Sequence, residues 1–338
     1  MNNTPITLKF LAEKLKMSVS TVSKALNNYP TINAYTKQRV QEMARELNFT
    51  PNKSAINLKE KKSRIIGVVL PNLLDHFFTR SIDGIEQVAT QNGYNVIISQ
   101  SHDELSKEIQ SANMLLRSRV DGLIVAISKQ TQDFAHLNQF EHMGIPVVYY
   151  TRNPSFNLSC HKVLGNTFQG CYEATKFLID RGHTKIAYLG GPKMTNFTHD
   201  RFNGYIHALK DNDVPFSAKF VAYTDFDKQN TIAAIKNLFA DPDHMPTALV
   251  AFKEPILFDA IKYLKSSNHP NFDKIESIGF GNNAFINYLD SPPIASIEEN
   301  PESVGENAIK LLLRLINKEI DMKNHQKVMV DCKLVVHG

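Results

Sequence analysis

The chain has 338 residues, 42% of them hydrophobic and 21% charged, and such a length and composition predict two or three domains of a soluble protein. No apolar run approaches the ~20 residues of a membrane span, and the start lacks the basic and then apolar pattern of a secretory signal. The three cysteines form no C-x-x-C pair, which argues against a disulfide framework or a thiolate zinc site and favours a reducing, cytoplasmic location.

Positive charge is concentrated at the amino-terminal end. Residues 1–64 hold twelve Lys and Arg but four Asp and Glu, and because the whole chain is +4, the rest is net negative. Such asymmetry predicts a phosphate-binding module on a body that does not bind phosphate broadly.

The stretch from Thr7 to Asn27 predicts a helix-turn-helix. Thr7 and Ser18 stand where a side-chain hydroxyl caps the first and the second helix. The first helix has an apolar face at helical spacing: Leu8, Leu11, Ala12 and Leu15. The apolar side of the second helix is Val19, Val22 and Leu26. A third helix is expected over Ala34 to Leu47, with an inner face of Val40, Met43, Ala44 and Leu47.

The second helix also has a polar side, formed by Ser20, Thr21, Ser23, Lys24 and Asn27. Short polar side chains with one cation are the chemistry that reads base edges in the major groove. The alternative is a three-helix cap with no ligand, but the local excess of Lys and Arg favours DNA binding.

Residues 49–64 connect this module to the rest of the chain. Pro51 is well placed as the first residue of a helix capped by Thr50, and a helix ending near Leu58 is too short to be stable alone in water. Residues 59–64 form a charged, solvated connector, for which a plain linker is the alternative interpretation.

From Ile65 onward, short apolar runs alternate with helical patterns. The runs cover 65–71, 95–99, 121–127 and 145–150, and they resume at 185–191, 247–252 and 277–280. Continuous apolar strands between amphipathic helices predict a parallel sheet covered on both faces. Two such α/β units make a bilobed body, with a ligand site in the cleft at the carboxyl ends of the strands.

Several motifs together resemble the LacI/GalR (lactose-repressor) family of bacterial transcription regulators. In the headpiece and hinge these are T-V-S-K-A-L-N (21–27), T-K-Q-R-V (36–40) and F-T-P-N-K-S-A-I-N-L (49–58). In the core they include I-I-G-V-V-L-P (65–71), R-V-D-G-L-I (119–124), R-G-H-T-K-I-A-Y-L-G-G-P (181–192), R-F-N-G-Y (201–205) and P-P-I-A-S-I (292–297). Their order and spacing make the resemblance specific over nearly the whole chain.

The resemblance implies a headpiece over residues 1–50, a hinge helix and linker over 51–64, and a bilobed core over 65–338. This core has a periplasmic-binding-protein-like fold of two doubly wound parallel sheets. The lobes are expected to be interleaved, with the chain crossing near Val163, Pro292 and Met322. The N-lobe then comprises about 65–163 and 293–321, and the C-lobe about 164–292 and 322–338.

The resemblance also implies a homodimer that places two headpieces on a pseudo-palindromic operator. The hinge becomes a helix only on DNA, where Leu58 wedges into a minor-groove step and kinks the duplex. The expected base-edge or phosphate contacts are Ser18, Ser20, Thr21 and Lys24. The expected backbone contacts are Thr7, Asn27, Asn52 and Lys53.

The chain departs from the family pattern at several positions. Lys24 stands where arginine or histidine is common and lacks the bidentate fork of arginine. Gly165 and Gly281 each replace an acid, and Lys253-Glu254 replaces an Asn-Asp pair that meets ligand hydroxyls. The Lys253-Glu254 change points away from the commonest neutral-hexose geometry and towards a modified or acidic sugar.

The expected strand-end loops carry the effector-binding candidates: Asp75, Phe77, Ser128, Arg152, Arg201, Phe226 and Glu254. Arg201 matches the family's ligand-binding arginine, and its guanidinium suits hydroxyls or a carboxylate; the alternative is a structural ion pair. Phe77 and Phe226 either stack on a ligand ring or belong to the core. This mixture of donors, acceptors and aromatic faces predicts a sugar or sugar derivative, with purines as the competing class.

No catalytic, cofactor or metal site is expected. The histidines lack H-x-x-x-H and H-E-x-x-H spacing, and G-x-G-x-x-G and G-x-S-x-G are absent. The predicted function is a cytoplasmic, ligand-responsive transcription regulator, most simply a repressor. A solute-binding receptor of the same bilobed fold is the alternative, but such a receptor has a signal peptide and no basic helix-turn-helix.

Overall fold

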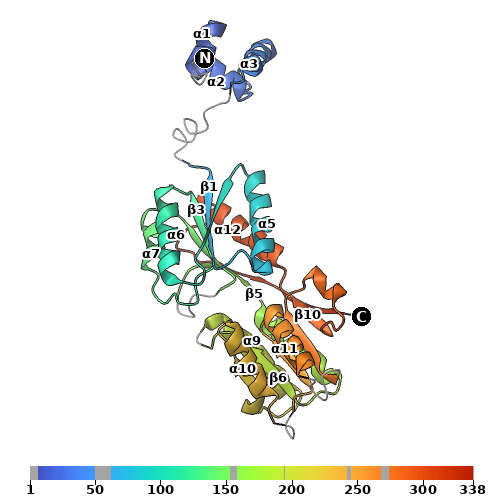
Figure 1. Cartoon of the computed structure of the whole chain (residues 1–338). Coiled ribbons are helices and arrows are strands. Elements are labelled where there is room, and N and C mark those ends of the chain that lie inside the picture. The colour runs from blue at the N-terminus through green and yellow to red at the C-terminus, as the bar shows by residue number, and fades with distance from the viewer. Residues whose placement is uncertain are drawn as a thin grey trace. The chain divides into compact units, whose positions relative to one another are not determined.

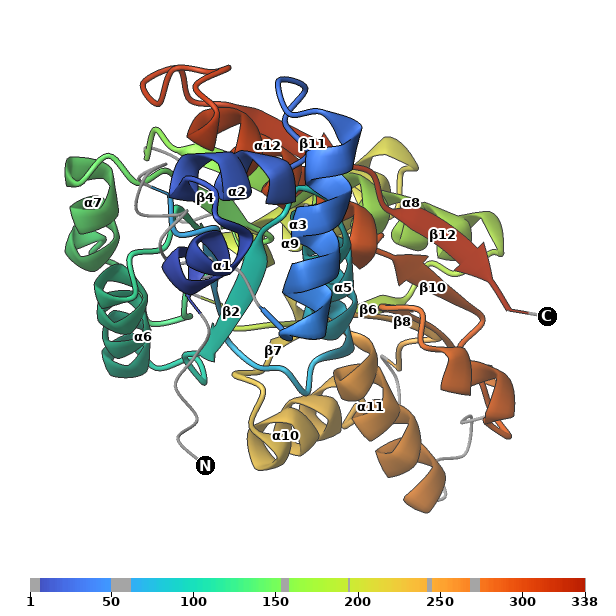
Figure 2. The same cartoon turned by 90° about the horizontal axis from the view of Figure 1, so that it is seen from above.

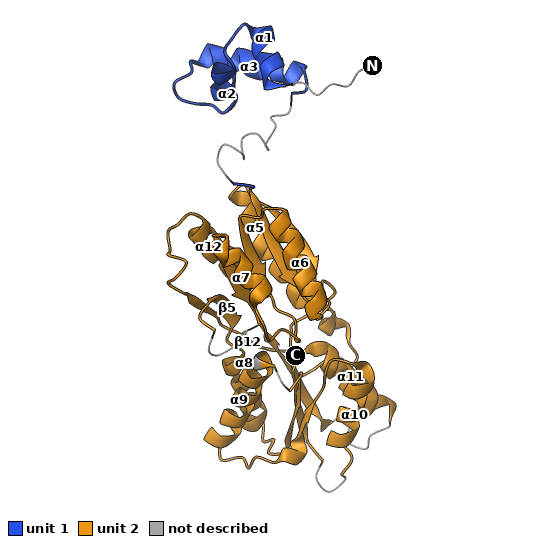
Figure 3. Ribbon diagram, turned by 90° about the vertical axis from the view of Figure 1, so that its left-hand side faces the viewer, with its two compact units in different colours: residues 1–63 blue, residues 64–338 orange. Residues whose placement is uncertain are grey.

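The computed structural model describes residues 7–49, 62–152, 158–193, 195–241, 245–267 and 274–337. The chain divides into two compact units, residues 1–63 and 64–338 (Figure 3). The predicted hinge helix, with Asn52, Lys53 and Leu58, lies outside the described residues. Among the residues described, no helix combines the length and apolar character needed to cross a membrane.

The amino-terminal unit is a three-helix headpiece of α1 (Leu8–Leu15), α2 (Val19–Leu26) and α3 (Ala34–Glu46). Its core comprises Leu11, Ala12, Leu15, Val22, Ala25, Val40 and Ala44. Both predicted caps are present, since Thr7 Oγ1 accepts from Phe10 N at 3.2 Å and Ser18 Oγ from Thr21 N at 3.0 Å. Val19, expected on the apolar side of α2, is 45% exposed because it occupies the first turn, outside the three-helix contact.

The N-lobe of the second unit is built on a six-stranded sheet of order β11-β5-β4-β3-β1-β2. Its strands are β1 (Ile65–Leu70), β2 (Asn95–Gln100), β3 (Gly122–Val125), β4 (Val147–Tyr150), β5 (His161–Gly165) and β11 (Lys327–Val330). Its helices are α5 (His76–Gln91), α6 (Leu105–Arg117), α7 (Ala135–His142) and α12 (Pro301–Ile316). All strand pairs in this sheet are parallel, as predicted.

Alternate strand residues of the N-lobe face two separate cores. Ile66 and Val68 pack with α5 and α12, whereas Val69 packs with α6 and α7. These two pairs of helices lie on opposite faces of the sheet (Figure 1). The helices α5 and α12 approach closely at glycines, because a Cβ on Gly84 would lie 2.3 Å from the Glu302 carbonyl oxygen.

The C-lobe repeats this plan with a sheet of order β12-β10-β9-β8-β6-β7. Its strands are β6 (Ile186–Gly190), β7 (Val221–Tyr223), β8 (Ala248–Ala251), β9 (Glu276–Phe280), β10 (Ala295–Glu298) and β12 (Lys333–Val336). Helices α8 (Thr167–Asp180) and α9 (Asn196–Asp211) cover one face, and α10 (Lys228–Leu238) and α11 (Glu254–Ser266) the other. Short 3-10 helices cover Ala218–Phe220 and Ala284–Tyr288.

The lobes are interleaved, but the chain changes sheets later than predicted. The first crossing follows β5 at Gly165, near the predicted Val163. The other two follow β10 at Glu298 and β11 at Val330, later than the predicted Pro292 and Met322. Residues 295–298 therefore belong to the C-lobe, where β10 pairs with β9 and with antiparallel β12 (Figure 2). Residues 327–330 belong to the N-lobe, where β11 pairs with β5. Each crossing comes after the end of a strand, because that strand stays hydrogen-bonded to its neighbour up to its last residues.

Candidate functional site

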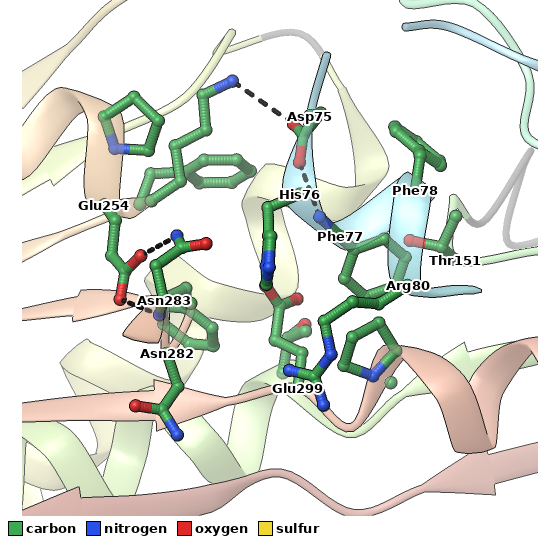
Figure 4. Close-up of a pocket in the computed structure, with 18 of the residues that line it drawn as sticks. Asp75, His76, Phe77, Phe78, Arg80, Thr151, Glu254, Asn282, Asn283 and Glu299 are labelled. Carbon is green, nitrogen blue, oxygen red and sulfur yellow. Dashed lines mark hydrogen bonds and ion pairs between the residues drawn. The ribbon is translucent and has the colours of Figure 1, made fainter. Parts of the chain in front are cut away.

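A cavity of about 690 Å³ lies between the two lobes, at the carboxyl ends of their parallel strands (Figure 4). Its lining includes six of the seven effector-binding candidates: Asp75, Phe77, Arg152, Arg201, Phe226 and Glu254. All four positions that depart from the family pattern in the core also line it: Gly165, Lys253, Glu254 and Gly281. The volume lies within the range of small-molecule sites.

Ser128 does not line the cavity. It is 2% exposed, its backbone N donates to Glu108, and its Oγ accepts from Gln130 N at 3.1 Å. The same carboxylate of Glu108 accepts from Thr131 Oγ1 at 2.9 Å and lies 2.8 Å from His136 Nε2. Ser128 therefore belongs to a buried polar cluster of the N-lobe.

Arg201, on α9, contacts the C-lobe through its guanidinium, although its buried Nε has no hydrogen-bond partner among the described residues. Its guanidinium lies 4.2 Å from the centroid of Phe252 and 3.9 Å from that of Phe280. It donates to the Phe252 carbonyl and, through Nη2, to Glu299 Oε1 at 2.5 Å. Burial raises the pKa of Glu299, and the neighbouring guanidinium opposes that rise. The arginine thus forms the structural ion pair weighed as the alternative, and it also lines the cavity.

Arg152 lies two residues after the end of β4 and is also paired. It donates to both oxygens of Asp103 and, at 2.8 Å, to the Ile127 carbonyl. Although burial alone would raise the pKa of Asp103, the hydrogen bonds and charge of Arg152 leave it lowered. The guanidinium lies 4.8 Å from the Phe197 ring centroid, so this N-lobe cation contacts the C-lobe.

Glu254, the first residue of α11, is fully buried. It accepts from Asn283 N at 3.3 Å, from the Asn283 side-chain amide and from Ser296 Oγ at 3.4 Å. Burial raises the pKa of its carboxyl group, and these donors oppose the rise. With its oxygens occupied by protein donors, Glu254 anchors the loop after β9.

The glycine at 281 is required by this arrangement. A Cβ there would lie 2.8 Å from Glu254 Cδ, and φ of Gly281 is +121°, a conformation that suits glycine. The two departures at 254 and 281 are therefore physically linked, because the Glu254 carboxylate occupies the space beside residue 281.

Asp75, Lys253 and Phe226 form a second contact between the lobes within the lining. Asp75 caps α5 by accepting from Phe77 N at 3.0 Å. Lys253 Nζ lies 3.8 Å from Asp75 Oδ2 and 4.1 Å from the centroid of the Phe226 ring. Phe226 has φ of +74°, a strained conformation for a bulky residue of the kind that clusters at functional sites. Phe77 both lines the cavity and packs against the N-lobe core.

Several lining residues were not singled out from the sequence: His76, Arg80, Thr151, Phe197, Asp200, Phe252, Asn282, Phe285, Glu298 and Glu299. Their common signal is a position at the carboxyl end of a strand, in the loop after it or in the first turns of the following helix. Arg80, like the other arginines, is neutralised, since it pairs with Glu298 and Glu302 at 3.1 Å.

The headpiece candidates differ in how free their side chains are. Ser20 and Lys24 are exposed on α2. Ser18 Oγ and Thr21 Oγ1 lie 2.8 Å apart, and Asn27 Nδ2 donates to the Ser23 carbonyl at 2.9 Å. Two further exposed aromatic residues, not predicted from the sequence, are Tyr29 and Tyr35.

Comparison with known proteins identifies the family. Residues 7–52 match the family described as "Bacterial regulatory proteins, lacI family", and residues 63–337 match "Periplasmic binding proteins and sugar binding domain of LacI family". The chain belongs to the LacI family. The resemblance and fold class predicted from the sequence are thus confirmed.

Among the relatives of this LacI-family chain is the HTH-type transcriptional repressor PurR of Vibrio campbellii, 30% identical over 95% of this chain and 94% of the relative. The repressor CytR of Escherichia coli is 27% identical over 99% and 96%. Among solved structures, the Lac repressor dimer bound to operator and the anti-inducer ONPF has a TM-score of 0.82 at 22% identity, and the CelR–cellobiose complex 0.73 at 20%, each covering 98% of both chains.

This LacI-family protein is therefore a DNA-binding transcriptional regulator with a small-molecule effector domain, as predicted. Its partners are operator DNA and a small-molecule effector. The headpiece match decides against a solute-binding receptor without a regulatory role. The relatives named are transcriptional regulators.

Proposed function

We propose that the chain is a cytoplasmic repressor without enzymatic activity, and that a sugar or sugar derivative in the interlobe cavity controls its operator affinity. The observation that carries this proposal is the pairing of charges around the cavity. Each lining arginine faces a carboxylate: Arg80 faces Glu298, Arg152 faces Asp103, and Arg201 faces Glu299.

This pairing favours a neutral ligand. The lining contains five carboxylates, four Lys and Arg, and seven phenylalanines. An anionic ligand would face a surplus of carboxylates, so the acidic sugar considered from the sequence is less favoured than a neutral one. Phenylalanine faces suit the C–H side of a sugar ring, while Asp75 and Asn282 offer hydrogen-bonding groups for hydroxyls.

Two solved relatives support the same ligand class. One is the CelR–cellobiose complex, and the other is a LacI-family regulator from Enterococcus faecium with bound ribose, which has a TM-score of 0.67 at 23% identity. At this identity the likeness is one of fold, so the proposal rests on the cavity. A nucleobase, which uses the same aromatic faces, remains the competing class.

For the headpiece, we propose that Ser20 and Lys24 contact base edges or phosphates. Both are exposed on the helix that the helix-turn-helix places in the major groove. Thr7 and Ser18 cap helices, and Thr21 and Asn27 make local hydrogen bonds, so their expected role is to contact the DNA backbone while holding helix geometry.

A thermal-shift screen tests the ligand class. Neutral monosaccharides and disaccharides, phosphorylated and acidic sugars, and nucleobases are compared on the full chain. A neutral sugar should raise the melting temperature, because a ligand that binds only the folded state stabilises it by mass action. A rise with a nucleobase and none with any carbohydrate would overturn the sugar proposal.

A further inference from the structure

The side chain of Lys253 occupies the cavity in a way that none of the other lining cations does. It extends from the residue between β8 and α11, at the carboxyl edge of the C-lobe sheet. Its side chain is 28% exposed and reaches across to Asp75, which caps α5 of the N-lobe. The arginines of the lining have carboxylates at 2.5–3.2 Å, whereas the Lys253–Asp75 pair is open at 3.8 Å.

The ring of Phe226 and the carboxylate of Asp75, which a ring-shaped ligand would contact, therefore already face Lys253. The ammonium group lies over the face of Phe226, 4.1 Å from the ring centroid, and a cation in this position is attracted by the ring quadrupole. The same ammonium faces the Asp75 oxygen that does not cap α5, since Oδ1 accepts from Phe77 N and Oδ2 faces Lys253.

Opposing interactions act on the charged form of Lys253. Burial lowers the pKa of its ammonium group, as do the charges of Arg152 and Arg201, while Asp75 and Asp103 act in the opposite direction. Lysine has a flexible four-carbon stem that lets the ammonium group reach solvent, and the side chain of Lys253 is already 28% exposed. A ligand can thus displace it at small cost.

We propose that Lys253 is a built-in occupant of the effector cavity: its ammonium group ties Asp75 of the N-lobe to Phe226 of the C-lobe, and the effector takes its place. This inference rests on the proposed function only for the class of ligand. It makes Lys253 one of the contacts that join the lobes, beside the Arg80–Glu298 ion pair and the hydrogen bond from Lys129 Nζ to the Asp225 carbonyl, and the contact that an effector replaces. Breaking this contact therefore contributes to the effector concentration at which the regulator responds. A ligand shifts the equilibrium only by its excess affinity over this internal contact.

The first test needs no ligand. Hydrogen–deuterium exchange is measured on the full chain for Lys253→Ala, Lys253→Arg and wild type. Two amides report on the cleft, since Phe77 N donates to Asp75 and Phe226 N to Thr224 Oγ1. In Lys253→Ala, exchange of peptides covering these amides should rise by roughly three- to tenfold, the loss expected for one weak ion pair and one cation–π contact. Lys253→Arg should exchange like wild type.

The matched control is Lys176→Met, which removes a lysine of the same lobe that pairs with Asp180 at 2.6 Å within α8. It should leave exchange at the cleft unchanged. Unchanged exchange in Lys253→Ala, or an equal rise in Lys176→Met, would overturn the proposal.

The second test uses the sugar that raises the wild-type melting temperature most in a panel of ribose, glucose, galactose and cellobiose. Its dissociation constant should fall by roughly three- to tenfold in Lys253→Ala, because the ligand no longer displaces the internal contact. A rise in the dissociation constant would make Lys253 an effector contact and overturn the proposal. If no sugar binds either protein, the sugar proposal fails, while the exchange measurement still decides the role of Lys253.

Discussion

Replacing Arg201 by methionine tests whether this arginine holds the C-lobe together. Methionine keeps much of the volume but removes the ion pair to Glu299 and the contacts with the rings of Phe252 and Phe280. The side chains of Arg201 and Glu299 are only 9% and 13% exposed. Removing one partner of a buried pair typically costs 3–5 kcal/mol; because some water reaches Glu299, we expect a loss near the lower end, about 3 kcal/mol.

The assay is urea denaturation followed by circular dichroism, since the chain has no tryptophan. Adding Glu299→Gln to Arg201→Met removes the carboxylate charge that the arginine substitution leaves unpaired. The double variant should therefore recover part of the lost free energy of unfolding. Burial already raises the pKa of Glu299, and the loss of Arg201 raises it further. A carboxyl whose pKa is raised in the folded state favours folding when it is protonated. The difference in free energy of unfolding between Arg201→Met and the double variant should therefore decrease as pH falls from about 8 to about 5.

An Arg201→Met protein with an unchanged urea midpoint would refute this reasoning. The reasoning would also be refuted if the double variant were more stable than Arg201→Met by the same free energy at every pH, because Arg201→Met would then have left no unpaired carboxylate. The result also bears on function: a destabilised C-lobe means that loss of effector response in an Arg201 variant is not by itself proof of a lost ligand contact.

Three further predictions concern other parts of the chain. Lys24→Ala should weaken specific operator binding by about 1–3 kcal/mol per protomer and binding to random duplex far less, as measured by fluorescence anisotropy; equal losses would make Lys24 a phosphate contact. Gly281→Ala should lower the free energy of unfolding by about 1–3 kcal/mol, because its Cβ meets the Glu254 carboxylate; an unchanged urea midpoint would show that the loop adapts. Hydrogen bonds from Arg181 lower the pKa of Glu276 to about 2. The ion pair between them therefore stabilises the fold at neutral pH, and this contribution is lost as pH falls from about 5 towards 2. Glu276→Gln should cost about 1 kcal/mol at neutral pH after allowance for solvent screening and less at low pH; a loss independent of pH would contradict the ion pair.

The sequence predicted the elements whose patterns are strongly periodic. The three headpiece helices and the caps of the first two follow from local chemistry. So do strands such as residues 65–70 and 248–251, which are apolar because both faces of the sheet are covered. The short strand β7 was not predicted, and the second and third crossings between lobes were placed too early, because the position of a crossing depends on which sheet accepts the strand. The run at residues 295–298 pairs with partners at 278–280 and 333–336 that no local pattern reveals.

The candidate site shows the same limit. Strand-end position brought six of seven predicted residues to the cavity, because parallel strands end at one edge. Sequence did not separate side chains that face the ligand space from those that support it. Glu254 and Arg201 were chosen for their chemistry, yet their partners, Asn283 and Glu299, lie distant in sequence. Ser128 follows a strand, but its backbone N donates to the buried Glu108 and its Oγ accepts from Gln130 N, so it lies outside the cavity.

The measurement that tests the central claim most directly is operator affinity as a function of effector concentration. An operator is first selected from random duplexes with the full chain, and its affinity is then measured by anisotropy with and without the sugar that stabilises the protein. We expect a pseudo-palindromic site, an affinity that falls steeply with salt, and a change of at least about tenfold, or roughly 1.4 kcal/mol, when the sugar is added. Selection of no preferred sequence, or a sugar that binds the cavity while operator affinity stays the same, would contradict the account.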